Sequence, residues 1–254
     1  MSERPFSQEP IGLVVAHRGA SLEAPENTLD AFDRAVAAGA GAVEFDVRVT
    51  ADDRGVVIHD ATVDRTTEGT GRVRDLSRTE LQRLPVRGGG RIPSLEEALE
   101  LLSGRAAIDV EIKNVPGEPD FDPGRERAVE LVHEALDAVA FVGDVIISSF
   151  NPLSLAASKL LRPEVATGLL TSTDVDARAG IAFAATQGHG WALPFIGQVE
   201  SASEDAVTAA REAGVRLGTW LTDDPAVAAG LFRSGIDAVA TNDPRRVVAA
   251  LSGR

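Results

Sequence analysis

The chain has 254 residues, of which 44% are hydrophobic and 25% are charged, a composition typical of folded globular proteins. Its net charge of −14 argues against nucleic acid or an anionic membrane surface as a partner, because both of these bind basic protein faces. The absence of cysteine excludes disulfide bonds and thiolate metal ligands.

The N-terminal segment MSERPFSQEP lacks the apolar run of a secretory signal. No segment approaches the roughly 20 apolar residues that are needed to span a bilayer. We therefore expect a cytoplasmic protein without stable membrane association. We also expect one domain over residues 1–254, as a monomer or a homodimer.

Short β-rich apolar segments alternate with amphipathic helical segments along the chain. Strands are predicted at residues 12–17, 42–49, 106–113, 145–150, 165–170, 190–195, 215–221 and 238–241. Helices are predicted near residues 28–38, 94–103, 125–139, 152–161, 174–186, 203–213, 225–234 and 244–252. Eight strands that are each followed by a helix predict an α/β fold, the closed (β/α)8 TIM barrel. An open doubly wound sheet is the alternative, although no glycine-rich dinucleotide motif follows the first strand.

Helix-start signals agree with this division. Three predicted helices begin with a capping Asn or Asp followed by proline, at Asn151, Asp224 and Asp243. Ser94 and Glu97 have the spacing of a capping box.

The segment VVAHRGASLEAPENT, residues 14–28, ends the first predicted strand with two polar side chains, His17 and Arg18. The PENT sequence then starts the first helix, for which we expect Asn27 to be the cap. Active sites of such barrels lie at the carboxyl ends of the strands, so His17 and Arg18 are candidates for a function.

A return strand and a long loop are expected after the second strand. The segment ADDRGVVIHD predicts a turn and a short strand that ends near His59. Residues 61–92 are predicted to form a polar loop rich in Gly and Arg, and loops of this length in compact domains are usually functional.

Charged and apolar side chains alternate in the second and third barrel strands, AVEFDVRV and AAIDVEIK. Because the outer face of a barrel packs on helices, the apolar set should point outward and the charged set inward. The inward set contains Glu44, Asp46 and Arg48 from one strand and Asp109, Glu111 and Lys113 from the other.

Buried carboxylates need a compensating charge, since each unpaired buried ion costs several kcal/mol. We expect Asp109, the deepest on its strand, to belong to an internal ion-pair network with Arg48 and Lys113. For Glu44, Asp46 and Glu111, near the carboxyl ends of their strands, a divalent metal site is favoured. Oxygen ligands alone indicate a hard ion such as Mg²⁺, Ca²⁺ or Mn²⁺.

His17 and His59 are two of only four histidines in the chain, and both should face the same end of the barrel. Paired imidazoles suit general base and general acid roles near neutral pH. His133 lies in a helix and is expected to be solvated, whereas His189 precedes a strand and could line the rim. Arg18 and Lys113 add the cations that an oxyanion such as a phosphodiester would need.

The sequence resembles the glycerophosphodiester phosphodiesterase family over nearly its whole length. The segments that carry the resemblance are AHRGASLEAPENT, AVEFDVRVTADDRGVVIHDATVDRTTEGTGRVRDLS, IPSLEEAL, IDVEIK, SSF and TWLTDD. The set is highly specific in this order and spacing. The inserted subdomain that family members often carry after the return strand is short here, so the resemblance implies an open mouth and small water-soluble diesters.

This resemblance implies a phosphoric diester hydrolase that releases sn-glycerol 3-phosphate and an alcohol. It implies His17 and His59 as the acid–base pair, with His17 favoured as the base. The nucleophile could be water or the 2-hydroxyl of the glyceryl group. The remaining implied roles belong to Glu44, Asp46 and Glu111 as ligands of one divalent cation, to Arg18 and Lys113 as phosphate-binding residues, and to Trp220 and Phe150 as walls of the substrate pocket.

Three other functions remain open from the sequence. A related barrel could cleave phospholipids in a bilayer, as phospholipase D toxins and phosphoinositide-specific phospholipases C do. A lyase could use Lys113 to form a Schiff base. A third alternative is a non-catalytic barrel that binds a phosphorylated ligand.

Overall fold

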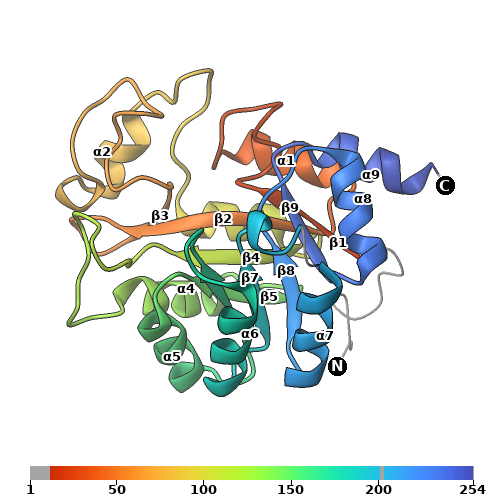
Figure 1. The fold of residues 1–254 in the computed structure, drawn as a ribbon. Helices are drawn as coiled ribbons and strands as arrows, with labels where there is room; N and C mark the ends of the chain where they lie inside the picture. Colours follow the sequence, from red (N-terminus) through yellow and green to blue (C-terminus); the bar gives the residue numbers. More distant parts are fainter. Residues whose placement is uncertain (1–11, 201–202, 254) are drawn as a thin grey trace.

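The computed structural model describes residues 12–200 and 203–253. The N-terminal segment MSERPFSQEP, which was predicted not to be a secretory signal, lies outside these residues. Its central element is a closed barrel of parallel strands (Figure 1). The strands are β1 (Leu13–His17), β2 (Ala42–Val49), β4 (Ala107–Ile112), β5 (Val145–Ser149), β6 (Ala166–Thr171), β7 (Trp191–Pro194), β8 (Arg216–Thr219) and β9 (Ala238–Thr241). They pair in the order β1-β9-β8-β7-β6-β5-β4-β2, and pairing of β1 with β2 closes the ring.

Helices surround this barrel and connect successive strands (Figure 1). They are α1 (Leu29–Ala37), α3 (Leu95–Leu102), α4 (Arg127–Ala138), α5 (Pro152–Leu161), α6 (Ala177–Thr186), α7 (Ser203–Ala213), α8 (Pro225–Ser234) and α9 (Pro244–Ser252). A 3₁₀ turn, η2 (Ile196–Gln198), precedes α7. The predicted (β/α)8 TIM barrel is therefore confirmed. None of the helices in the described ranges is both long and apolar enough to cross a membrane.

The predicted helix caps are largely confirmed. Asn151, Asp224 and Asp243 each accept a backbone N–H at the start of a helix whose first residue is proline. Ser94 and Glu97 form both hydrogen bonds of a capping box. The cap of α1 differs from the prediction, since it is Thr28 and not Asn27.

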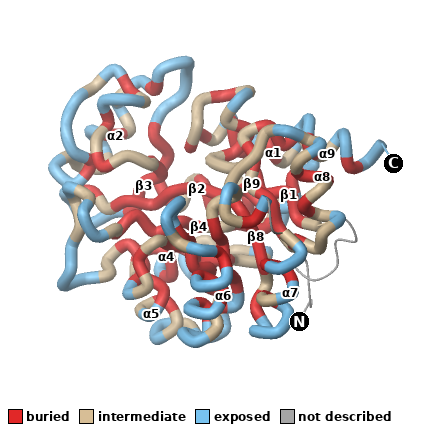
Figure 2. The backbone as a smooth tube through the Cα atoms, viewed as in Figure 1, coloured by how far each residue is buried: buried red, intermediate tan, exposed pale blue. Residues whose placement is uncertain are grey.

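The alternating charge pattern gives the barrel two different layers. Phe45, Val47 and Ile108 point outward and join the large apolar core between strands and helices. A second apolar cluster lies inside the barrel and includes Leu170 and Leu193. Figure 2 shows the central strands as buried along most of their length, with exposure concentrated in the outer loops and helix faces.

Two interior glycines make room for Leu193 inside the barrel. A Cβ atom at Gly168 would lie 2.8 Å from Leu193 Cδ1, and a Cβ atom at Gly218 would lie 2.7 Å from Leu193 Cδ2. Leu193 therefore fills the space that two side chains would otherwise occupy. The barrel interior remains open above it, towards the carboxyl ends of the strands.

The segment after β2 is more ordered than the predicted polar loop. The return strand β3 (Gly55–Val57) pairs antiparallel with β2, as predicted. Residues 61–92 then contain a 3₁₀ turn, η1 (Val73–Asp75), and a helix, α2 (Arg78–Arg83), which project beyond β3 (Figure 1). These elements have a small apolar core, made by Val56, Ile58, Val63, Val73, Leu81, Val86 and Ile92. The prediction of a polar loop missed these two short elements and their apolar core, because the apolar residues follow no helical or strand period.

Candidate active site

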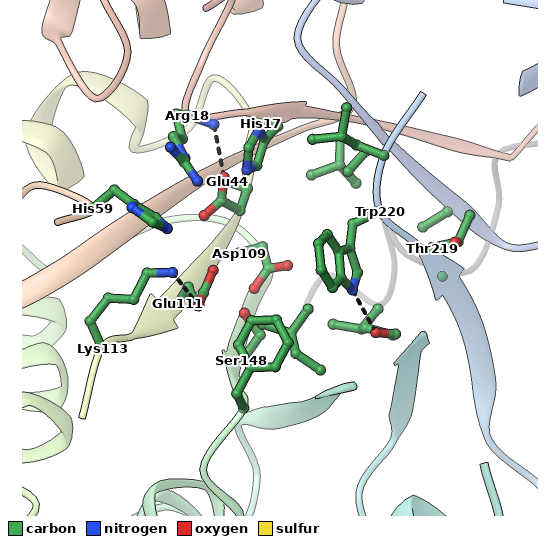
Figure 3. A pocket seen from close by; sticks show the side chains of 18 residues that line it. His17, Arg18, Glu44, His59, Asp109, Glu111, Lys113, Ser148, Thr219 and Trp220 are labelled. Atoms are coloured by element: carbon green, nitrogen blue, oxygen red, sulfur yellow. Dashed lines mark hydrogen bonds and ion pairs between the residues drawn. The ribbon is translucent and has the colours of Figure 1, made fainter. Parts of the chain in front are cut away.

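A cavity of about 300 Å³ opens at the carboxyl ends of the barrel strands. Figure 3 shows its polar side, where His17, Arg18 and His59 face Lys113. Eight of the nine site residues proposed from the sequence line this cavity. The ninth, Asp46, is fully buried behind it. The structure thus brings together side chains that are distant in the sequence.

Three buried carboxylates, those of Glu44, Asp46 and Glu111, form the densest group of negative charge in this site. One oxygen of each lies within 4.8 Å of the other two. Burial, together with the neighbouring carboxylates, raises the pKa of Glu44 well above its usual range. Burial also raises the pKa of Glu111 to about 7, although Lys113 opposes this shift. Glu44 Oε1 is buried without a hydrogen-bond partner among the described residues, so the group fits a bound cation.

Asp46 is the anchor of the polar side. Its carboxylate lies 3.0 Å from Lys113 Nζ and 3.3 Å from Arg18 Nε, and it accepts a 2.7 Å hydrogen bond from Asn27 Nδ2. Burial would raise the pKa of Asp46, but Lys113, His59 and Arg18 outweigh it and hold the pKa well below the usual range. Asp46 is therefore a permanent anion that orients two cations.

Lys113 is held between two carboxylates. Its Nζ lies 2.5 Å from Glu111 Oε1 in addition to its contact with Asp46. Burial would lower the pKa of Lys113, but Asp46 and Glu111 raise it above its usual range. The amine is consequently a fixed positive charge at the cavity wall.

The loop after β1 is shaped around Arg18. This residue has a left-handed backbone (φ 55°), and its N–H donates to Glu44 Oε2 at 2.8 Å. The guanidinium donates to Glu26 Oε1 at 2.9 Å. Asn27, also left-handed, returns the loop by donating its N–H to the Arg18 carbonyl.

Asn27 is therefore part of the site and does not cap α1, contrary to the prediction. Its amide holds Asp46, as described above. The cap is Thr28, whose hydroxyl accepts from the N–H of Ala31. The sequence PENT offers two adjacent residues that can cap a helix, and only the path of the loop decides between them.

His17 is held by an amide. Its Nδ1 lies 2.8 Å from Asn242 Oδ1, and Asn242 Nδ2 donates to Asp223 Oδ2 at 3.0 Å. Because Asp223 accepts from the amide nitrogen, the amide oxygen must face the imidazole. Nδ1 then carries the proton and Nε2 is free to accept one. Burial, assisted by Arg18, lowers the pKa of His17 to about 4.

His59 is held by a carboxylate. Its Nδ1 lies 2.6 Å from Asp60 Oδ1, and Arg65 binds both Asp60 and Glu26. Burial lowers the pKa of His59, while Asp46 and Asp60 oppose the shift. Hydrogen bonding from Arg65 lowers the pKa of Asp60 to about 2. The two imidazoles thus differ in the charge of their partners.

The expected network that joins Asp109 to Arg48 and Lys113 does not form. Arg48 is buried but pairs with Glu118 and Asp120 from the loop after β4. None of the ion pairs within the described ranges includes Asp109, which lines the cavity instead. The prediction failed because the loop carboxylates that reach Arg48 come from a segment without any strand or helix pattern.

An apolar wall faces the charged side of the cavity. Trp220 packs edge-on against Phe150, with ring centroids 5.5 Å apart, and against Phe195, at 5.2 Å. Its Nε1 donates to the carbonyl of Leu193 at 3.1 Å, which fixes the indole ring. Phe150 and Trp220 therefore lie where the sequence placed them, on the cavity wall.

The other two histidines lie elsewhere, and both predictions about them were wrong. His133 is buried between α4 and α5, with Nε2 3.0 Å from Ser158 Oγ. His189 is also buried, and its Nδ1 lies 2.9 Å from Thr167 Oγ1 near the amino ends of β6 and β7. His189 is therefore far from the rim of the cavity.

Sequence reasoning missed four residues that hold the site: Asn27, Asp60, Asp223 and Asn242. Asp60 directly follows His59, which is a weak signal that it could contact the imidazole. Asp223 and Asn242 lie next to residues that were interpreted only as helix starts. No local pattern indicated that they would reach His17.

Comparisons with known proteins agree with this geometry. The sequence model of the glycerophosphoryl diester phosphodiesterase family matches residues 17–246. A glycerophosphodiester phosphodiesterase of Caldanaerobacter subterraneus subsp. tengcongensis is 35% identical, over 93% of this chain and 96% of that protein.

Two solved structures have the same fold. A phosphodiesterase of Oleispira antarctica, in complex with the product sn-glycerol-3-phosphate, has a TM-score of 0.83 and 27% identity, over 95% of this chain and 97% of that one. A glycerophosphodiester phosphodiesterase of Agrobacterium tumefaciens has a TM-score of 0.77 and 28% identity, over 94% and 99%.

Proposed function

The chain belongs to the glycerophosphoryl diester phosphodiesterase family, and from this premise we propose that it hydrolyses glycerophosphodiesters to sn-glycerol 3-phosphate and an alcohol. The observation that carries the proposal is the convergence of two differently held imidazoles and three buried carboxylates on one cavity. The same cavity contains two cations that can bind phosphate oxygens.

In this proposal Glu44, Asp46 and Glu111 hold one divalent ion, Mg²⁺, Ca²⁺ or Mn²⁺. The donor set supports it, because all three ligands are carboxylate oxygens and Glu44 Oε1 has no other partner among the described residues. When bound, such an ion supplies positive charge to the phosphate and relieves the repulsion among the carboxylates.

Arg18 and Lys113 bind the non-bridging phosphate oxygens. Both are held in place by Asp46, so they are oriented before substrate arrives. Arg18 presents a planar set of donors and Lys113 a point charge. A Schiff-base reaction would require a neutral amine, whereas the two carboxylates beside Lys113 favour its protonated form.

His17 acts as the general base and His59 as the general acid. Asn242 holds the Nδ1 proton of His17, which leaves Nε2 to accept a proton from the nucleophile, a water or the glyceryl 2-hydroxyl. Attack by the 2-hydroxyl forms a cyclic phosphate, which a water then opens to sn-glycerol 3-phosphate. Asp60 favours the protonated form of His59, which then gives a proton to the leaving oxygen. Phe150 and Trp220 bound the substrate on the apolar side.

The test is the release of sn-glycerol 3-phosphate from glycerophosphocholine, glycerophosphoethanolamine and glycerophosphoglycerol. We expect release with Mg²⁺, Ca²⁺ or Mn²⁺ present and its loss with EDTA. The absence of product from all three diesters with every ion would overturn the proposal. Turnover confined to phospholipid vesicles would establish the phospholipase alternative instead.

A further inference from the structure

Two polar side chains in the cavity floor have no role in the reaction described above. Asp109 on β4 and Ser148 on β5 both line the cavity, next to one another in Figure 3. Asp109 Oδ1 and Ser148 Oγ are buried and close enough to interact with each other, but neither makes a hydrogen bond of good geometry with any described residue. Buried polar atoms with incomplete hydrogen bonding are uncommon and costly, so a pair of them on a cavity wall indicates a ligand that completes their hydrogen bonds.

The surroundings disfavour both an anion and a metal at this position. Asp109 is outside the group of three carboxylates that lie close enough to share a cation. Lys113 and Arg18 are paired with other carboxylates. The rest of the floor is apolar and includes Leu170 and Leu193.

A hydroxyl group satisfies both atoms at once. It can donate its proton to the Asp109 carboxylate and accept the proton of the Ser148 hydroxyl. A quaternary ammonium group, the charged end of a choline, can pair with the charge of Asp109 but can form a hydrogen bond with neither residue. The apolar side chains nearby suit the carbon skeleton that carries the hydroxyl.

We propose that Asp109 and Ser148 bind the terminal hydroxyl of the glyceryl group and so determine which end of the diester enters the floor of the cavity. This inference rests on the proposed function, which supplies a glyceryl group next to the phosphate. The leaving alcohol then points to the open mouth. A diester with an acyl chain on the terminal hydroxyl does not fit, because the ester removes the donor and adds bulk.

The experiment compares glycerophosphocholine with its 1-deoxy analogue, the phosphocholine ester of propane-1,2-diol, which keeps the 2-hydroxyl. For the unmodified protein we expect kcat/KM to be at least about tenfold lower for the analogue, since the two floor groups are then left unpaired. Ser148→Ala and Asp109→Ala should lose most of this preference. Asp109→Asn keeps an acceptor oxygen and should retain part of it.

Thr171→Val is the matched control. Thr171 on β6 also has a buried hydroxyl without a partner among the described residues, but it does not line the cavity. This variant should keep the full preference. The ratio of the kcat/KM values for the two substrates, measured in one variant, does not depend on the fraction of that variant that is folded.

Equal kcat/KM for the two substrates in the unmodified protein would overturn the inference, as would an unchanged preference in both alanine variants. Either result leaves the proposed function intact, because glycerophosphocholine is still hydrolysed. Failure of the proposed function has a different signature, the absence of sn-glycerol 3-phosphate from any substrate.

Discussion

The two halves of the barrel interior follow the same alternation but carry opposite chemistry. On β1, β2 and β4 the inward residues near the cavity include His17, Glu44 and Glu111, whereas on β6 and β7 they are Leu170 and Leu193. The apolar half is ordinary barrel packing, in which burial stabilises the fold. The charged half opposes folding unless each ion is compensated, so its arrangement reflects function more than stability.

The largest expected effect comes from the histidines of the charged half. His17→Ala and His59→Ala should each lower kcat by about 10²–10⁴-fold, because proton transfer to or from the substrate is lost. The measurement is steady-state release of sn-glycerol 3-phosphate, with circular dichroism to confirm folding. His189→Gln, at a buried histidine outside the cavity, should keep kcat and lose only stability. Equal losses in all three variants would remove the distinction between the two halves.

The next effect concerns the carboxylate group. With metal present, Glu44→Gln should lower turnover by about 10–100-fold or more. In EDTA the same variant should melt at a higher temperature than the unmodified protein, since burial and neighbouring carboxylates disfavour the Glu44 anion. The destabilisation of the unmodified protein by Glu44 grows as the pH rises above the ordinary carboxyl pKa. The unfolded state loses its Glu44 proton there readily, whereas the folded state, in which the Glu44 pKa is raised, must give up a proton that it binds tightly. A lower melting temperature in EDTA would show that the charge cluster is not destabilising.

A smaller effect should follow from changing the partner of His17. Asn242→Asp places a carboxylate on Nδ1, which favours the protonated imidazole and raises its pKa from about 4. The acid limb of kcat/KM against pH should therefore move to higher pH. Ser21→Ala removes a neutral hydroxyl that contacts Asn242 and the His17 carbonyl but adds no charge at Nδ1, so it should leave the limb in place. An unmoved limb in Asn242→Asp would argue against His17 as the base.

The smallest effect belongs to the apolar half. Trp220→Leu or Phe150→Leu should raise KM by about 3–10-fold with little change in kcat, because a contact present in both ground and transition states is lost. Trp191→Phe is the control, since Trp191 is buried in the barrel but does not line the cavity. A large loss of kcat in Trp220→Leu would place the indole in the chemistry itself.

Much of the fold could be predicted from the sequence because its signals are local. The period of two in AVEFDVRV and IDVEIK follows from the pleat of a strand, and it assigned Glu44, Asp46 and Glu111 to the barrel interior without any tertiary information. Proline after a capping Asn or Asp similarly located the starts of α5, α8 and α9.

The partners of those side chains were decided only by the tertiary structure. Asn242 reaches His17 across 225 positions because barrel closure brings β9 beside β1. Arg48 finds Glu118 and Asp120 in a loop that has no periodic pattern. Asp109, expected to be paired, instead faces the cavity, and the register between β4 and β5 sets it opposite Ile146, with Ser148 one inward position further along β5. Periodicity sets the face on which a side chain lies, whereas its contacts depend on strand register and closure, which no local segment encodes.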